Sequence, residues 1–237
     1  EVVRAALRGR LKCSSKEGFV KLGGLETVRT ELEAAKRFLL LGCGTSYYAG
    51  LVGEYFFESI ARVPTEVELA SEFRYRDTLL QEETAVIAIS QSGETADTLA
   101  ALRKAKQQKL LSLGIINVVG STIARETDAG VYNHAGPEIG VASTKAFLSQ
   151  LSVLVLISLH LSRVKDKQKL ALMGELERVP AHIEAILKKG KEIERLAEKY
   201  LAYGNAFFLG RGYNYPVALE GALKLKEISY MHAEGYS

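Results

Sequence analysis

Short, almost wholly apolar runs alternate along the chain with segments of helical periodicity. Residues 37–42 (RFLLLG), 84–90 (TAVIAIS) and 111–119 (LSLGIINVV) are apolar at successive positions, whereas a strand with one face in water alternates apolar and polar residues. Strands that are buried on both faces need helices above and below them. The pattern therefore predicts an α/β fold in which right-handed βαβ units build a parallel sheet between two helical layers.

The other elements are expected to follow the same alternation. Residues 1–25 mix charges, glycine and serine, and we expect a short helix there followed by irregular chain. The longest apolar stretch, residues 147–161, is broken by polar side chains such as Gln150 and His160. A membrane span needs roughly 18 nearly uninterrupted apolar residues, so a buried helix is expected instead. Helices are expected over residues 25–36, 47–62, 95–108 and 143–164, and further strands over residues 64–70 and 128–135.

A second copy of one strand and helix follows near the end of the sequence. Sliding residues 205–229 over the earlier segment by 168 positions superposes the Gly-x-Gly turn at Gly210 on the one at Gly42. Between the copies, residues 166–201 are charged and amphipathic, and Pro180 is expected to open a second helix there. The expected organisation is a lead-in over residues 1–25, a first domain over 26–165, a helical connector over 166–195 and the truncated start of a second domain over 196–237.

Composition excludes several classes of protein. The net charge is only +3, and no basic run is interleaved with aromatic residues, so nucleic-acid binding is not indicated. Cys13 and Cys43 match no metal-ligand spacing and indicate a reducing, cytoplasmic compartment. The four histidines form no ligand set either, so no metal site is predicted.

The turns at the carboxyl ends of the strands are the places to look for a ligand, because open α/β sheets bind ligands there. The turn after residues 37–42 begins Gly-Cys-Gly, but Tyr47 stands where a dinucleotide-binding turn needs its third glycine. A bulky ring at that position disfavours a nucleotide-dependent oxidoreductase. The turn instead offers Thr45 and Ser46 at the start of a helix, where backbone N–H groups are free.

The turn after residues 84–90 is unusually rich in hydroxyl groups. Ser90, Ser92 and Thr95 surround Gly93 just where a helix is expected to begin. A phosphate monoester could accept hydrogen bonds there from backbone N–H groups and from several hydroxyls. The alternative is that Ser92 or Thr95 merely caps the helix. Because one cap needs only one hydroxyl, two such turns favour a site for a small sugar phosphate.

Two further segments are candidates. In residues 136–145 (GPEIGVASTK), Glu138 and Ser143 precede a long helix, and the alternative is a simple helix cap at Ser143. In residues 220–229 (EGALKLKEIS), carboxylates at positions 220 and 227 share a helix face with a lysine at position 224. The alternative there is a solvated ladder of ion pairs. A carboxylate beside a lysine near a sugar phosphate would suit proton transfer at a carbon next to a carbonyl.

Taken together, four motifs resemble one known family. CGTS, SQSGETADTL, GPEIGVASTKAF and ALEGALKLKEISYMHAE occur in this order, as in the sugar-isomerase (SIS) region of the glutamine:fructose-6-phosphate aminotransferases. The resemblance implies a three-layer αβα sandwich of flavodoxin type with a five-stranded parallel sheet. It also implies conversion of fructose 6-phosphate and glutamine-derived ammonia into glucosamine 6-phosphate, with no cofactor, by a homodimer.

The resemblance also implies roles for single residues. Glu227 is similar to the base that moves a proton between C1 and C2 of the sugar, with Lys224 as its neighbour. The remaining roles are a phosphate cradle of Ser46, Ser90, Ser92 and Thr95, contacts beside the sugar from Thr45 and Gln91, and a lining of the sugar chain's other side by Val141 and Ser143.

Departures from the family pattern limit what this stretch of sequence is expected to do. The family's glutaminase domain and its N-terminal cysteine nucleophile are absent, and the ring-opening histidine and the Schiff-base lysine would lie beyond Ser237; His232 is not that histidine. We expect a fragment that binds the sugar phosphate but yields no glucosamine 6-phosphate from glutamine and fructose 6-phosphate. The alternative, a non-catalytic SIS module that senses a sugar phosphate and regulates a partner, has no need of Glu227 beside Lys224.

Overall fold

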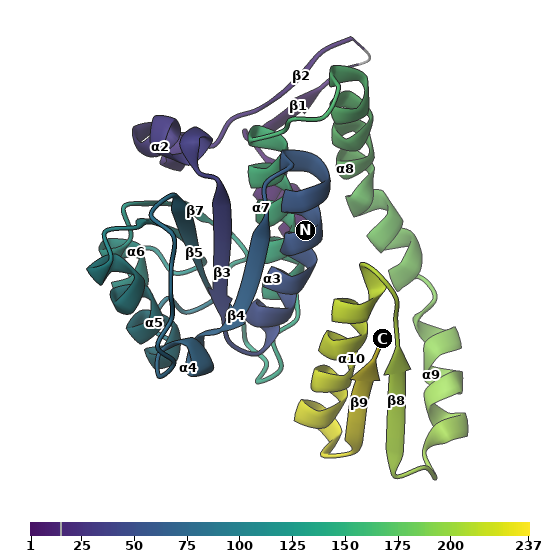
Figure 1. Ribbon diagram of the computed structural model, residues 1–237. Helices are drawn as coiled ribbons and strands as arrows, with labels where there is room; N and C mark the ends of the chain where they lie inside the picture. Colours follow the sequence, from purple (N-terminus) through teal and green to yellow (C-terminus); the bar gives the residue numbers. More distant parts are fainter. Residues whose placement is uncertain (15) are drawn as a thin grey trace.

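A five-stranded parallel sheet lies at the centre of the computed structural model, which describes residues 1–14 and 16–237 (Figure 1). The strands lie in the order β4-β3-β5-β6-β7, and every neighbouring pair is parallel. This is the flavodoxin order, so the predicted fold class is confirmed. The strands are β3 (Arg37–Gly42), β4 (Thr65–Leu69), β5 (Thr84–Ser90), β6 (Leu111–Ile116) and β7 (Ala129–Tyr132).

Helices cover both faces of this sheet and form the outer layers of the sandwich. Along β3, Phe38 and Leu40 belong to the core under one layer, whereas Leu39 and Leu41 belong to the core under the other. This is why the strands are apolar at successive positions. The first layer contains α1 (Val2–Leu7), α3 (Thr45–Phe56), which a π-helical turn (Phe57–Ala61) extends, and α7 (Lys145–His160); the second contains α4 (Ala70–Phe73), α5 (Ala96–Gln107) and α6 (Thr122–Glu126).

The long apolar helix α7 is buried, as expected, with its neighbours α1 and α3 packed against it. Within residues 1–14 and 16–237, no helix combines the length and the apolar character that crossing a bilayer requires.

The second copy of the strand and helix forms a separate βαβ unit. It consists of β8 (Asn205–Leu209), α10 (Asn214–Ser229) and β9 (His232–Tyr236), and the two strands are parallel. Ala206 pairs with Ala233, which is the pairing of Phe38 with Thr65 displaced by 168 positions. The sequence pattern did not indicate β9, because a single short strand at its position carries no apolar run.

The connector differs from the expectation in one respect. Pro180 does not open a second helix; it lies inside α8 (Asp166–Leu187), and the break comes later, before α9 (Gly190–Tyr200). Proline costs an interior helix one hydrogen bond. Here Met173 and Pro180 are both buried, and neighbouring apolar side chains of α8 pack on the core of the first unit. This packing keeps the helix continuous.

The lead-in is more regular than expected. Residues 1–25 contain an antiparallel hairpin of β1 (Leu11–Cys13) and β2 (Gly18–Val20) after α1. Three-residue strands are too short to show a period in the sequence. The helix expected over residues 25–36 is split into a 3₁₀ helix (Gly23–Val28) and α2 (Arg29–Ala34).

Substitution of Leu40 tests how much the buried core of the central sheet contributes to the free energy of unfolding. Its side chain is fully buried in β3, whereas Leu79 is fully exposed in a loop. We expect Leu40→Ala to lower the free energy of unfolding by about 2–5 kcal/mol, through lost burial and the cavity left behind. Leu79→Ala should change it by less than about 0.5 kcal/mol. Urea denaturation of both variants checks this, and equal effects would contradict the assignment of the core.

Candidate functional site

The two hydroxyl-rich turns lie side by side because β3 and β5 are neighbours in the sheet. The order of the strands reverses between them, and a crevice at such a switch point is where doubly wound folds bind ligands. Thr45 and Ser46 begin α3 and are each 9% exposed, and Ser90 at the end of β5 is 2% exposed. The structure therefore brings together the turns that the sequence singled out.

The turn after β5 is held by its own hydroxyl groups. The backbone N–H of Gly93 donates to Ser90 Oγ at 3.0 Å, and the N–H of Glu94 donates to Ser92 Oγ at 3.1 Å. Ser90 Oγ and Thr95 Oγ1 lie 3.1 Å apart. Thr95 occupies the N-cap position of α5, yet its side chain makes no capping hydrogen bond. The capping alternative is therefore wrong for Thr95, and the start of α5 keeps its free N–H groups.

The segment after β7 is arranged differently. Glu138, rather than Ser143, secures the start of α7: its carboxylate accepts hydrogen bonds from Thr144 Oγ1 at 3.2 Å and from the N–H of Ala146 at 3.0 Å. Ser143 Oγ is buried without a hydrogen-bond partner among the described residues. Val141 is 98% exposed, so the structure does not pack its side chain against the two hydroxyl-rich turns.

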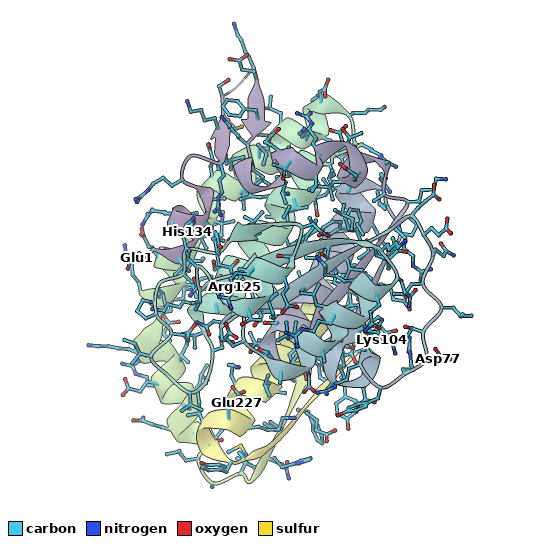
Figure 2. All side chains as sticks on the ribbon, turned by 90° about the vertical axis from the view of Figure 1, so that its left-hand side faces the viewer. Glu1, Asp77, Lys104, Arg125, His134 and Glu227 are labelled. Atoms are coloured by element: carbon cyan, nitrogen blue, oxygen red, sulfur yellow. The ribbon has the colours of Figure 1, made fainter. Side chains whose placement is uncertain are left out.

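Helix α10 of the second unit packs against α3 and brings charged side chains to the first turn. Lys224 Nζ donates to Thr45 Oγ1 at 2.9 Å and pairs with Glu227 Oε2 at 2.5 Å. Thr45 Oγ1 in turn donates to Glu220 Oε1 at 2.9 Å. Figure 2 shows Glu227 on α10 below the sheet. One connected cluster thus joins residues that are about 180 positions apart in the sequence.

Burial distinguishes this cluster from a ladder of surface ion pairs. The side chains of Glu220 and Lys224 are 7% and 18% exposed, and Glu227, at 33%, is the member most open to solvent. Burial raises the pKa of Glu220 above its ordinary value, although Lys224 and the hydrogen bond from Thr45 act in the opposite direction. The solvated-ladder alternative is therefore wrong for Glu220 and Lys224.

Two polar residues at this edge were not selected from the sequence. Glu220 was noted only for sharing a face with Lys224 and Glu227. Gln150 lies fully buried on α7, and its Nε2 donates to Ser46 Oγ at 2.9 Å. An amide in the middle of an otherwise apolar helix was the signal that could have identified it, because a buried polar group needs a partner.

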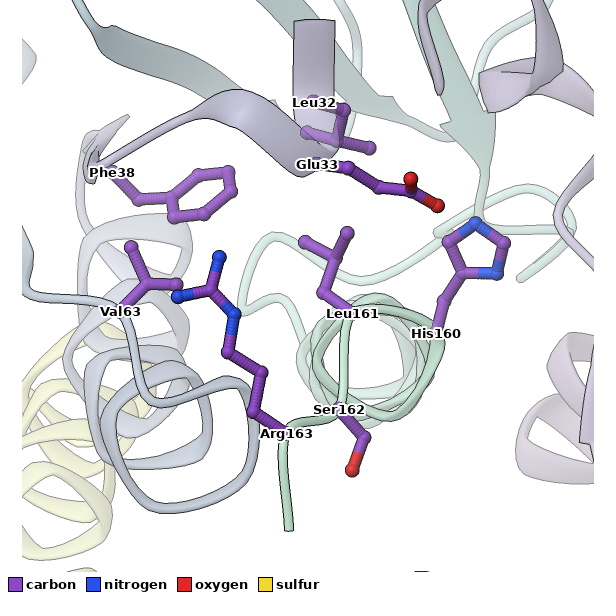
Figure 3. A pocket seen from close by; sticks show the side chains of 8 residues that line it. All are labelled: Leu32, Glu33, Phe38, Val63, His160, Leu161, Ser162 and Arg163. Atoms are coloured by element: carbon purple, nitrogen blue, oxygen red, sulfur yellow. The ribbon is translucent and has the colours of Figure 1, made fainter. Parts of the chain in front are cut away.

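A separate cavity of about 180 Å³ lies at the opposite end of the sheet (Figure 3). Phe38, at the start of β3, and Val63 line one side of it, next to the guanidinium group of Arg163. Glu33 and His160 line the other side, and His160 Nδ1 lies 3.4 Å from the carbonyl oxygen of Val20. The residues that line this cavity do not include those of the hydroxyl-rich turns. The cavity lies at the amino end of β3, away from the edge where such sheets bind ligands.

Comparison with known proteins gives a consistent result. A family model described as SIS domain matches residues 31–159 and 202–237. Glutamine–fructose-6-phosphate aminotransferases (isomerizing) of Chlorobaculum tepidum and Bacteroides thetaiotaomicron are 54% and 49% identical to the chain over its whole length. The chain spans only 39% of the length of each of these relatives.

Solved structures agree with these relatives. The C-terminal domain of glucosamine-fructose-6-phosphate aminotransferase from Francisella tularensis has a TM-score of 0.91 at 42% identity, and the match covers 99% of this chain and 66% of that one. Glucosamine-6-phosphate deaminase from Thermotoga maritima has a TM-score of 0.73 at 26% identity, with coverage of 90% and 64%.

The raised pKa of Glu220 predicts a pH effect on stability. Between its ordinary pKa of 4.5 and the raised value, the folded state keeps a proton that the unfolded chain has released. The contribution of Glu220 to the free energy of unfolding therefore falls as the pH rises through this interval. The difference in unfolding free energy between the parent chain and Glu220→Gln should fall over the same interval and then level off. Urea denaturation at a series of pH values measures it, and a difference that rises with pH would contradict the burial of an acid at this position.

Proposed function

The chain belongs to the SIS domain family, and we propose that it forms the fructose 6-phosphate-binding, isomerising part of a glutamine–fructose-6-phosphate aminotransferase. The observation that carries the proposal is the meeting of two hydroxyl-rich turns with a lysine–carboxylate pair from another unit. The turns suit a phosphate, and the pair suits proton transfer on the attached sugar. Relatives that bear this enzyme name align over the whole chain, which supports the same substrate.

In this proposal the phosphate lies between the starts of α3 and α5. Neither helix has a side-chain cap. In α3 the N–H of Ser46 already donates to the carbonyl of Cys43 at 3.1 Å, so the other N–H groups of the two first turns would donate to phosphate oxygens. The positive ends of the helix dipoles favour the negative charge. The hydroxyls of Ser46, Ser90, Ser92 and Thr95 complete the cradle. Neutral donors bind the phosphate without fully neutralising its charge. This suits a phosphate that must be released after each turnover.

The sugar then extends toward α10, beside Thr45 and Gln91. Glu227 is the proposed base that carries a proton between C1 and C2, because it is the carboxylate of the cluster most open to solvent. Lys224, 2.5 Å away, stabilises the negative charge of this carboxylate and of the oxygen that develops charge during proton transfer. Val141 and Ser143 are proposed to line the other side of the sugar chain. For Val141, which is 98% exposed, this requires the segment after β7 to close over the ligand.

The full reaction of the parent enzyme, including the use of glutamine, belongs to this proposal too, because the chain spans about two fifths of its relatives. A homodimer in the cytoplasm is proposed as its setting. Cys13 and Cys43 are both free thiols, as expected in a reducing compartment.

Calorimetric titration tests the proposed substrate. The chain should release or absorb heat with fructose 6-phosphate and glucosamine 6-phosphate, but not with unphosphorylated fructose or NAD. Ser90→Ala should weaken binding of fructose 6-phosphate about tenfold, since the hydroxyl both shapes the turn and faces the charged ligand.

Ser158→Ala is the matched control for this substitution. Ser158 is also buried but lies near the far end of α7, where its hydroxyl donates to the carbonyl of Leu154 at 2.9 Å, so its variant should bind like the parent chain. Heat with NAD but not with the sugar phosphates would refute the proposal.

A further inference from the structure

We infer that Glu94 is a positioning residue of the candidate site, whose carboxylate ties the hydroxyl-rich turn after β5 to the turn after β6. The inference rests on the proposed function. Glu94 Oε1 accepts a hydrogen bond from the backbone N–H of Thr122 at 2.6 Å. Thr122 is the first residue of α6, where a helix leaves its N–H groups without partners of its own. Neither residue belongs to the proposed phosphate cradle itself.

The two turns lie side by side because β5 and β6 are neighbours in the sheet. Two backbone hydrogen bonds join them. The N–H of Asn117 donates to the carbonyl of Gln91 at 3.3 Å, and the N–H of Ile123 donates to the carbonyl of Gly93 at 3.0 Å. The bond that Glu94 accepts is shorter than both and is made by a side chain. The turn after β6 therefore supports the proposed phosphate-binding turn along its length.

Gly93 shows how closely the two turns pack. Its φ of +67° lies in the left-handed region, which favours glycine. A Cβ atom at this position would lie 2.0 Å from Ser121 Oγ and 2.8 Å from Ile116 Cγ2, so the turn after β5 rests directly on the turn after β6. The N–H of Gly93 also donates to Ser90 Oγ, one of the proposed phosphate ligands. A displacement between the turns would thus reach the cradle through a single residue.

The charge of Glu94 makes this role testable. Glu94 is exposed, and the hydrogen bond from Thr122 lowers the pKa of its carboxyl below the ordinary value, because the bond stabilises the ionised form. A carboxylate beside a phosphate site repels the anion. Charge and position therefore predict opposite effects of removing the side chain. Binding becomes tighter if only the charge acts, and weaker if the hydrogen bond holds the turn in its binding conformation.

Two neutral variants of the 237-residue chain separate these effects. Glu94→Gln and Glu94→Ala both remove the charge, but the amide oxygen of glutamine can still accept from the N–H of Thr122. We expect Glu94→Ala to bind inorganic phosphate and fructose 6-phosphate about fivefold more weakly than Glu94→Gln, as for the loss of one hydrogen bond. Without this bond the turn spends more time in conformations that do not bind. Calorimetric titration measures both ligands, and equal affinities of the two variants would overturn the inference.

The donor can be removed independently of the acceptor. Proline has no N–H and is tolerated at the first position of a helix, and the extended backbone of Ser121 suits a following proline. Thr122→Pro should weaken phosphate binding relative to Thr122→Ala, which keeps the N–H, as much as Glu94→Ala does relative to Glu94→Gln. Glu94→Ala and Thr122→Pro together should weaken binding no further than either alone. Additive losses would contradict a bond between these two groups.

The matched control is Glu126→Ala. Glu126 is a carboxylate on α6 itself, where it accepts two hydrogen bonds from Arg103 of α5 at 2.9 and 2.6 Å. Its side chain makes no hydrogen bond to either turn within residues 1–14 and 16–237. The control variant should therefore bind both ligands within twofold of the parent chain. Equal weakening by Glu126→Ala and Glu94→Ala would overturn the inference, because any disturbance of α6 would then suffice.

Nuclear magnetic resonance without ligand keeps this result distinct from failure of the proposed function. In the ¹⁵N-labelled chain, the amide signal of Thr122, identified by its absence in Thr122→Pro, should shift upfield in Glu94→Ala, and the amide order parameter of Gly93 should fall. Both should stay close to the parental values in Glu94→Gln and Glu126→Ala. An unchanged order parameter of Gly93 in Glu94→Ala would overturn the positioning role. Absence of sugar-phosphate binding by the parent chain would instead refute the proposed substrate, and the Gly93 signal would still decide whether Glu94 holds the turn.

Discussion

The packing of α10 against α3 is the contact on which the candidate site depends. Without it, the hydroxyl groups and helix starts of the first unit would lack the lysine–carboxylate cluster of α10, which reaches them through Thr45. The contact is held at one end by the cluster around Thr45 and Glu220 and at the other by Tyr213, whose ring lies 4.9 Å from that of Tyr55. The two helices therefore run antiparallel, and the start of α3 meets the second half of α10.

This arrangement follows from the internal repeat. The offset of 168 positions relates the strand pairing of β3 with β4 to that of β8 with β9, and it also relates the buried Leu25, Val28 and Leu32 to exposed apolar residues of α9. Along α10, however, the chemistry has diverged. Val52, Phe56 and Ser59 of the first copy correspond to Glu220, Lys224 and Glu227 in the second. Each copy thus supplies a different half of the site, namely turns from one and a charged helix face from the other.

The central sheet and the two turns could be predicted from the sequence because their signals are local. An apolar run in β5 and the hydroxyl groups that follow it are visible within about a dozen residues. Pro180 was misjudged because packing of α8, which depends on distant parts of the chain, outweighed a local rule. The sequence placed Glu220 on a helix face but not in the site. Its partner Thr45 is 175 positions away, and a single sequence contains no pattern that shows which residues so far apart are in contact.

Because the turns come from one copy and the charged helix face from the other, the two halves of the candidate site differ in their types of residue. Hydroxyls and backbone N–H groups bind an anion without carrying charge, so the only fully charged side chains in the described cluster are on α10. A cationic side chain at the start of α3 would repel the ammonium group of Lys224, which donates to Thr45 there. The proposed phosphate donors are neutral hydroxyl and N–H groups, and Lys224 pairs with the two carboxylates of α10. The buried Glu220 loses hydration, and its contacts with Thr45 and Lys224 compensate for this loss.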